Sequence, residues 1–110
     1  MKVGLYFGSF NPIHIGHLII ADAVLLEPSI DKVWFVVSPQ NPFKKSSSLL
    51  PEHSRYYLTQ LATEENPNFA VSNIEFSMPK PSYTIDTLHY LKEKHSGKEF
   101  SILMGGDNLS

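Results

Sequence analysis

The chain of 110 residues contains no cysteine, so disulfide bonds, thiolate metal ligands and cysteine nucleophiles are all excluded. It also lacks a large charge of either sign, and a formal net charge of −2 argues against broad binding to nucleic acid or to a membrane surface. Its apolar runs are far shorter than the roughly 20 residues of a membrane span, and no signal peptide is recognisable. These absences predict a cytoplasmic protein that binds neither nucleic acid nor membranes.

The residues that are present are those of an ordinary globular protein, with 42% hydrophobic and 12% aromatic side chains. The length predicts one domain, residues 1–110, at the small end for an α/β enzyme. Residues 106–110 stop where a further helix is expected to begin. We therefore expect this domain to be truncated at its C-terminal end.

Short, continuous apolar runs predict strands that are buried on both faces. Three such runs are clear, at residues 3–7, 32–37 and 100–104. A less regular strand, the third in chain order, is marked by Phe69, Val71, Ile74 and Phe76.

Apolar residues with helical spacing fill the intervals between these strands. The first helix is expected to begin near Ile15 and to end before Pro28, and the second to begin at Pro51. The third is expected to begin at Ser82 and to end before Gly97. The residues predicted for the inner faces of the second and third helices are Tyr57, Leu58, Leu61, Ile85, Leu88 and Leu91.

The alternation of strands and helices predicts an α/β fold, a Rossmann-like doubly wound parallel sheet with helices on both faces. In such sheets, ligands bind beyond the carboxyl ends of the strands. The segments after the first, second and fourth strands are residues 8–17, 38–45 and 105–110, and they hold most of the polar residues of functional type. We therefore expect one binding site made by these three loops.

The loop of residues 8–17 is predicted to bind a phosphate, because it leads from a strand into a helix N-terminus. Unpaired N–H groups and the positive end of the helix dipole both favour an anion there. Gly8 would allow close approach of the backbone to the ligand, and Pro12 would stiffen the turn. Gly16 would leave room for a nucleotide against the helix.

His14 and His17 are three residues apart at this helix entry, so both side chains can face one ligand. Taken alone, such a pair is more often a helix cap and an exposed surface residue. A zinc site is less favoured still, because no third ligand lies nearby in the sequence. The glycine spacing matches neither the dinucleotide-binding fingerprint nor a P-loop.

Residues 8–17, GSFNPIHIGH, resemble the G-x-F-D-P-x-H-x-G-H signature of the nucleotidyltransferase superfamily, with Asn11 where many members have Asp. Residues 38–44 (SPQNPFK), 82–88 (SYTIDTL) and 105–109 (GGDNL) are similar to motifs of bacterial nicotinate-mononucleotide adenylyltransferases. The resemblance implies transfer of AMP from ATP to nicotinate mononucleotide, with Mg²⁺ as the cofactor. The products would be deamido-NAD and pyrophosphate.

The resemblance also implies roles for individual residues. The catalytic residues would be His14, His17 and Lys44, with a protonated His17 stabilising charge and Lys44 neutralising a phosphate. The implied ATP-binding residues are Gly8, Ser9, Phe10, His14, Gly16, His17, Gly105 and Asp107. The implied substrate-binding residues are Asn41, Lys44, Tyr83, Thr84 and Asp107.

Simpler interpretations of several of these residues remain open. Tyr83 and Thr84 would meet the pyridine carboxylate at a helix start, but the same stretch could be a plain N-cap. Lys44 could be a solvated loop lysine, and Asp107 could cap the next helix. Arg55 is either a phosphate contact or a surface residue.

One part of the family pattern is not found in these 110 residues. Family members continue with a further strand region and an I-S-x-T-x-I-R motif, whereas the only arginine here is Arg55. In the strand order 3-2-1-4-5 of the family, the fifth strand would be missing and residues 100–104 would be a bare edge. We therefore expect the other half of the ATP site to lie outside this chain. Alternatively, a partner chain covers that edge, as it could in a homo-oligomer.

Two alternative functions follow from the same residues. One is a sister nucleotidyltransferase that acts on nicotinamide mononucleotide, phosphopantetheine or glycerol phosphate. The other is a nucleotide-binding module without catalytic activity. A DNA-binding domain is disfavoured by the net charge and by the lack of a basic recognition helix.

Overall fold

The computed structural model describes residues 1–10, 12–38, 51–78 and 84–104. Four parallel strands form one sheet in the order β3-β2-β1-β4. The strands are β1 (Lys2–Gly8), β2 (Lys32–Val37), β3 (Phe69–Ser72) and β4 (Glu99–Met104). The predicted α/β fold and the strand order 3-2-1-4 are therefore confirmed.

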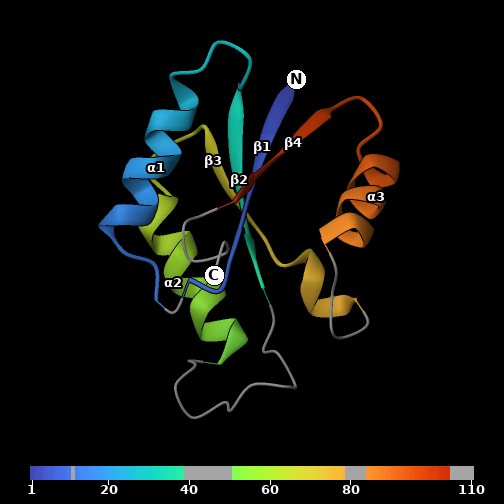
Figure 1. Ribbon diagram of the computed structural model, residues 1–110. Coiled ribbons are helices and arrows are strands. Elements are labelled where there is room, and N and C mark those ends of the chain that lie inside the picture. Colours follow the sequence, from blue (N-terminus) through green and yellow to red (C-terminus); the bar gives the residue numbers. More distant parts are fainter. Residues whose placement is uncertain (11, 39–50, 79–83, 105–110) are drawn as a thin grey trace.

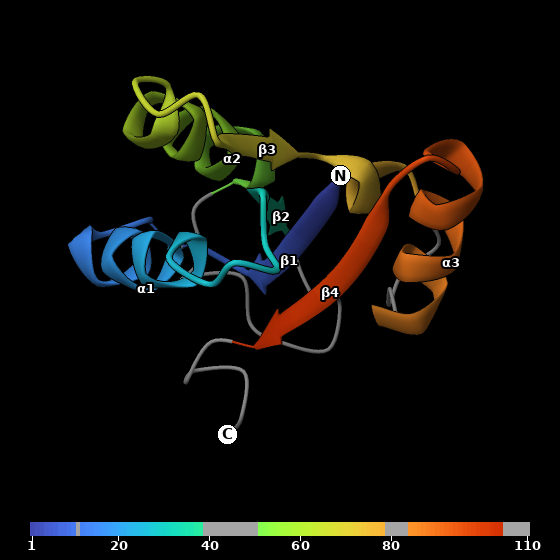
Figure 2. The ribbon, with the colours of Figure 1, turned by 90° about the horizontal axis from the view of Figure 1, so that it is seen from above.

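In the described ranges, three helices and one short 3₁₀ helix connect the strands. They are α1 (Ile15–Leu25), α2 (Glu52–Thr63), η2 (Ile74–Ser77) and α3 (Thr84–Lys94). Figures 1 and 2 show α1 and α2 on one face of the sheet and α3 on the other. This arrangement confirms the predicted doubly wound sheet. Within the described ranges, no helix has the length and apolar character needed to cross a membrane.

The two central strands are buried on both faces, which explains their continuous apolar sequence. Successive side chains point to opposite faces of a strand. Tyr6 accordingly packs with Phe35 on the face covered by α1 and α2. Val3 and Leu5 pack with Leu91 of α3 on the other face. Each buried side chain of this size stabilises the fold by roughly 1.5–3 kcal/mol, so both helix layers hold the sheet in place.

The third strand is shorter than predicted, since Ile74 and Phe76 lie in η2 and not in a strand. The N–H of Ile74 donates to the Ser72 side-chain oxygen at 3.2 Å, and the N–H of Phe76 donates to the Asn73 carbonyl at 2.9 Å. These local bonds turn the chain out of the sheet. Both apolar side chains still pack against the core, so their spacing resembled that of a strand.

The predicted inner face of α2 is wrong. Tyr57 and Leu61 are 59% and 45% exposed, and Leu58 is also exposed. The buried residues of this helix are Arg55, Thr59 and Thr63. The threonine hydroxyls donate to the carbonyls four residues earlier, each at 2.8 Å, so this polar face is buried with its hydrogen bonds satisfied.

The predicted inner face of α3 is partly wrong. Leu91 is buried and Leu88 is half-buried against the core, as expected, but Ile85 is 74% exposed. Thr87 is fully buried in its place. Its hydroxyl donates to the Glu75 carboxylate at 2.6 Å, which is why a polar residue is tolerated inside.

Candidate functional site

The loops that follow β1 and β2 begin side by side. Gly8 is paired with Val37 at the carboxyl ends of the two strands. The N–H of Ser38 then donates to the Gly8 carbonyl at 2.9 Å. This geometry agrees with the expectation that the segments after these strands share one edge of the sheet.

Several predicted site residues lie outside the described part of the chain. These residues are Asn41, Lys44, Tyr83, Gly105 and Asp107. Thr84 is described only as the first residue of α3. The predicted site residues within the described ranges, besides Thr84, are Gly8, Ser9, Phe10, His14, Gly16 and His17.

His14 and His17 form the N-terminal cap of α1. The Nδ1 atom of His14 accepts a hydrogen bond from the Gly16 N–H at 3.1 Å. The His14 N–H in turn donates to Nδ1 of His17 at 3.1 Å. This reciprocal arrangement is a capping box built from two histidines, in place of the usual Ser or Thr with Glu. The two histidines therefore cap the helix and also place two imidazole rings at the predicted anion site.

These bonds determine which ring nitrogen carries the proton. A nitrogen that accepts a hydrogen bond has no proton, so each neutral ring carries its proton on Nε2. Both neutral rings thus offer an Nε2–H donor. The rings are stacked, with their centroids 3.9 Å apart. A doubly protonated His17 could not accept the bond from His14. The protonated His17 expected from the sequence thus requires that this cap bond be broken.

The ring of His17 also packs against aromatic side chains of the core. Its centroid lies 5.0 Å from that of Phe10 and 6.1 Å from that of Tyr6, with edge-to-face geometry in both pairs. His14 is exposed, whereas His17 is half-buried. The aromatic core thus fixes the position of His17 more firmly than that of His14.

The two glycines of the loop make room for neighbouring rings. A Cβ atom at Gly16 would lie 2.9 Å from Cε1 of His14, and a Cβ atom at Gly8 would lie 3.1 Å from Cζ of Phe10. The sequence suggested that Gly16 leaves room for a nucleotide. In the structure, the His14 ring occupies that space, so Gly16 is needed to seat the cap.

Phe10 has a backbone conformation that is unusual for a residue with a side chain. Its φ of 46° lies in the left-handed region, and no other non-glycine residue of the described part of the chain has a positive φ. Such a conformation costs roughly 1–3 kcal/mol and needs support from its surroundings. The Phe10 ring is 1% exposed and packs edge-on against Tyr6 and Phe35. Burial of this ring therefore holds the strained turn of the loop.

Of the two roles left open for Arg55, that of a surface residue is wrong. Its side chain is fully buried, and Nη1 donates to the carbonyls of Ser9 and Ser38, both at 2.7 Å. Burial lowers the pKa of the guanidinium, an effect that nearby Glu52 opposes. Arg55 thus joins α2 to the two loops at the carboxyl edge. The sequence left its role open, and its spacing from Thr59 and Thr63 was the available sign of a buried polar face.

Glu75 is a second buried charged residue that sequence reasoning missed. Its carboxylate accepts hydrogen bonds from Thr87 and from the side chain of Ser38. Burial raises the pKa of Glu75, and the two hydrogen bonds partly offset that rise. Ser38 is therefore held by Arg55 at its carbonyl and by Glu75 at its side chain.

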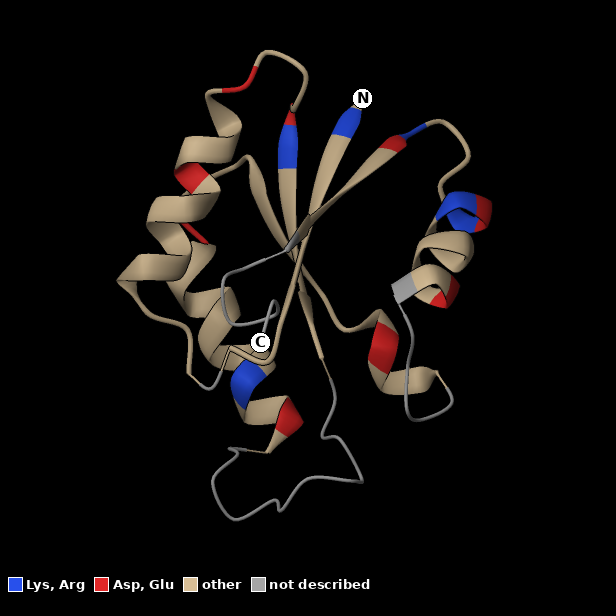
Figure 3. Ribbon diagram, viewed as in Figure 1, with Lys and Arg blue, Asp and Glu red and all other residues tan. Residues whose placement is uncertain are grey.

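Arg55 is the positive side chain that the described ranges place closest to this edge. In those ranges, the lysines lie at strand starts, before β4 or in the last turn of α3 (Figure 3). They are Lys2, Lys32, Lys92, Lys94 and Lys98. No group of three or more His, Cys, Asp or Glu residues suited to a metal ion occurs in the part of the chain that is described.

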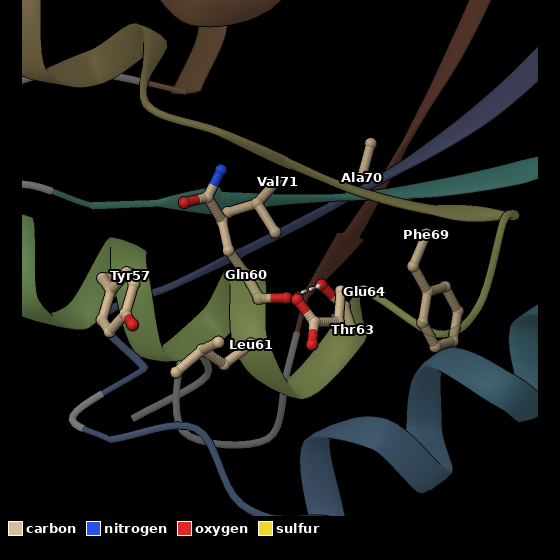
Figure 4. Close-up of a pocket in the computed structure, with 8 residues that line it drawn as sticks. All are labelled: Tyr57, Gln60, Leu61, Thr63, Glu64, Phe69, Ala70 and Val71. Carbon is tan, nitrogen blue, oxygen red and sulfur yellow. Dashed lines mark hydrogen bonds between the residues drawn. The ribbon is translucent and has the colours of Figure 1, made fainter.

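A pocket of about 370 Å³ lies elsewhere, between α2 and the edge strand β3. Figure 4 shows its lining, which includes the exposed apolar side chains of Tyr57 and Leu61 together with Phe69 and Val71. None of the lining residues belongs to the loops after β1 and β2. This pocket is therefore separate from the predicted phosphate site.

A family profile described as cytidylyltransferase-like matches residues 5–110. A curated protein of Cytophaga hutchinsonii, named probable nicotinate-nucleotide adenylyltransferase, is 55% identical over 99% of this chain and 57% of its own length. A protein of the same name from Flavobacterium psychrophilum is 53% identical over the whole chain and 57% of its own length. The chain thus spans little more than half the length of these relatives.

The fold is similar to that of solved structures as well. The Plasmodium falciparum nicotinic acid mononucleotide adenylyltransferase complexed with NaAD superposes with a TM-score of 0.76 at 23% identity, covering 92% of this chain and 50% of that one. The same enzyme complexed with APC gives a TM-score of 0.73, covering 92% and 49%. At this level of identity, the likeness concerns the fold alone.

Proposed function

The chain belongs to the cytidylyltransferase-like family, and on this premise we propose that the protein transfers AMP from ATP to nicotinate mononucleotide. The products are deamido-NAD and pyrophosphate. The observation that carries the proposal is the two-histidine cap of α1, in which the Nδ1 atoms of both rings accept backbone N–H groups at a helix N-terminus beyond β1. The names of the curated relatives support the choice of acceptor.

In the proposed reaction, the phosphate of nicotinate mononucleotide attacks the α-phosphorus of ATP. A new P–O bond forms to the acceptor, and the bond to the leaving pyrophosphate breaks. The nucleophile is already an anion, so the protein needs no strong base. Catalysis then consists of positioning the two phosphates and stabilising the charge that develops on the leaving group.

The loop after β1 would bind the ATP phosphates. The Nε2–H groups of His14 and His17 donate to phosphate oxygens, together with the Ser9 hydroxyl and backbone N–H groups from Gly8 to Phe10. Neutral rings can make these bonds without losing the helix cap. Gly16 supports the site indirectly, because it makes room for the His14 ring.

The remaining contacts are proposed for residues outside the described ranges. Lys44 neutralises phosphate charge from the loop after β2, and Asn41 of the same loop contacts the acceptor. Gly105 lies next to ATP, and Asp107 meets a ribose or the acceptor. These placements rest on the motifs in the sequence.

The acceptor's pyridine ring is proposed to lie at the start of α3, next to Tyr83 and Thr84. The helix begins at Thr84. The positive dipole end and the first N–H groups of a helix favour a carboxylate over a neutral amide. This supports nicotinate, rather than nicotinamide, as the ring of the acceptor.

Mg²⁺ is proposed to accompany ATP and to neutralise phosphate charge when it is bound. This ion usually keeps several waters and binds mainly to substrate phosphates in such sites. That preference fits a site whose described residues are N–H donors and not carboxylates.

We also propose a cytoplasmic location, where ATP is available, and assembly into a homo-oligomer.

The function is tested with a panel of acceptors and the protein at the length its gene encodes. Pyrophosphate release is followed with Mg-ATP, or with Mg-CTP, and each of four acceptors: nicotinate mononucleotide, nicotinamide mononucleotide, phosphopantetheine and glycerol phosphate. We expect the fastest turnover with ATP and nicotinate mononucleotide. Faster turnover with another acceptor would refute the nicotinate assignment, and ATP binding without pyrophosphate release from any pair would indicate a binding module.

A further inference from the structure

We propose that Arg55 is a positioning residue: its guanidinium holds the carbonyls of Ser9 and Ser38 and thereby orients the Ser9–Phe10 peptide toward the bound phosphate. The inference rests on the proposed function, in which backbone N–H groups of this loop bind ATP. Arg55 itself does not touch the nucleotide. It acts through the two loops that do.

The contacts of Arg55 are short and shielded from water. Its Nη1 atom lies 2.7 Å from the Ser9 carbonyl and 2.7 Å from the Ser38 carbonyl. Nη1 carries two N–H donors, one for each oxygen. The side chain is fully buried, so the guanidinium itself is removed from bulk water. Charge-assisted bonds of this kind are roughly twice as strong as neutral ones.

The bond to Ser9 determines where the next N–H points. The Ser9 carbonyl and the Phe10 N–H belong to one planar trans peptide, in which they point in opposite directions. Because Arg55 holds the carbonyl from the side of α2, the Phe10 N–H is directed away from α2. The φ of Phe10, 46°, is strained, so loss of the bond would remove one of the contacts that support this turn beside the buried Phe10 ring.

The bond to Ser38 fixes the start of the second loop. The Ser38 N–H already donates to the Gly8 carbonyl at 2.9 Å, so Arg55 adds a second attachment one peptide further along. The segment that begins here carries Asn41 and Lys44. One guanidinium therefore sets the distance between the loop proposed for the ATP phosphates and the loop proposed for the acceptor.

The energetic cost of this arrangement supports a positioning role. Burying a guanidinium requires removal of its water, which is also why burial lowers the pKa of Arg55. An apolar side chain of similar volume often stabilises a protein as well as a buried ionic group does. Such a side chain could not hold two carbonyls that lie 46 and 17 residues away in the sequence.

The test compares Arg55→Met and Arg55→Lys with the control Thr63→Val. Methionine fills similar space without donors, and lysine keeps the charge but not the planar pair of donors. The control removes a buried hydrogen bond from the same face of α2 without touching either loop. At a temperature well below unfolding, we expect kcat/KM for ATP to fall about 100-fold in Arg55→Met and about tenfold in Arg55→Lys. Thr63→Val should lose thermal stability but keep kcat/KM within twofold.

Titration with inorganic tripolyphosphate separates this inference from the proposed function. If the wild type transfers AMP but both Arg55 variants match Thr63→Val at equal folded fraction, the positioning role is overturned and the function stands. If the wild type transfers no AMP, the affinity for tripolyphosphate decides. A loss of about tenfold in the Arg55 variants supports positioning, whereas equal affinity, or no binding by the wild type, overturns it. Should Arg55→Met fail to fold, Arg55→Lys decides by the same criteria.

Discussion

The two faces of the sheet hold the carboxyl edge in different ways. On the face covered by α1 and α2, the buried charge is Arg55, which binds backbone carbonyls. On the face covered by α3, the buried charge is Glu75, which accepts bonds from the side chains of Thr87 and Ser38. Arg55 therefore fixes the backbone of the proposed phosphate loop and the start of the loop after β2, whereas Glu75 connects the end of β2 to the helix proposed to bind the acceptor.

This difference divides the proposed reaction between the faces. Changes on the α1 and α2 face should alter parameters that depend on ATP. Changes on the α3 face should mainly alter stability or the acceptor.

Replacement of His17 by alanine should lower kcat by about 100- to 1,000-fold, the usual effect of removing one donor to a developing negative charge. The KM for nicotinate mononucleotide should change little, because His17 is proposed to contact the ATP phosphates and not the acceptor. Steady-state kinetics with each substrate varied in turn provides the measurement. An unchanged kcat would remove His17 from the mechanism.

Replacement of Gly16 by alanine should lower kcat/KM for ATP by about tenfold. The new Cβ atom would lie 2.9 Å from Cε1 of His14, so that ring must leave its position in the cap. Gly97→Ala is the matched control, because nothing lies within 4 Å of the Cβ atom it adds. Equal kinetics for the two variants would show that the seating of His14 is unimportant.

Replacement of Glu75 by glutamine should change the pH dependence of stability. Burial raises the pKa of Glu75 in the folded protein, so the folded state binds the proton more tightly than the unfolded state. The free energy of unfolding of the wild type should therefore fall as pH rises from the usual glutamate pKa through the raised folded value. The Gln variant lacks this titration, and its stability relative to the wild type should increase over the same range.

Urea unfolding at a series of pH values measures this effect. Glu93→Gln serves as the control, since Glu93 is on the same side of the sheet but its side chain is 71% exposed. A stability difference between wild type and Glu75→Gln that does not vary with pH would contradict the burial of an ionisable Glu75.

Much of the fold could be predicted because its central strands are buried on both faces. The bounds of β2, residues 32–37, were predicted as observed, since a continuous apolar run is unambiguous there. The inner face of α2 could not be predicted from hydrophobicity. Arg55 and the threonines beside it are buried because distant carbonyls and the helix backbone satisfy them, and periodicity does not reveal those partners.

The candidate site shows the same contrast. The spacing of His14 and His17 predicted that they act together, and their stacked rings confirm that they are brought together. Their mutual capping and the resulting position of the protons depend on ring geometry that spacing does not specify. Glu75 was hidden because it lies in a stretch that resembles a strand but folds as a 3₁₀ helix.

The central claim, that the two-histidine cap binds the triphosphate of ATP, is tested most directly by nitrogen NMR of the histidine rings during a titration with Mg-ATP. We predict that His14 and His17 carry their protons on Nε2 and that both Nε2 resonances shift as ATP binds. His95, which packs against Trp34 on the α3 face, should not change. Saturation with ATP that leaves the His14 and His17 resonances unmoved would contradict the account.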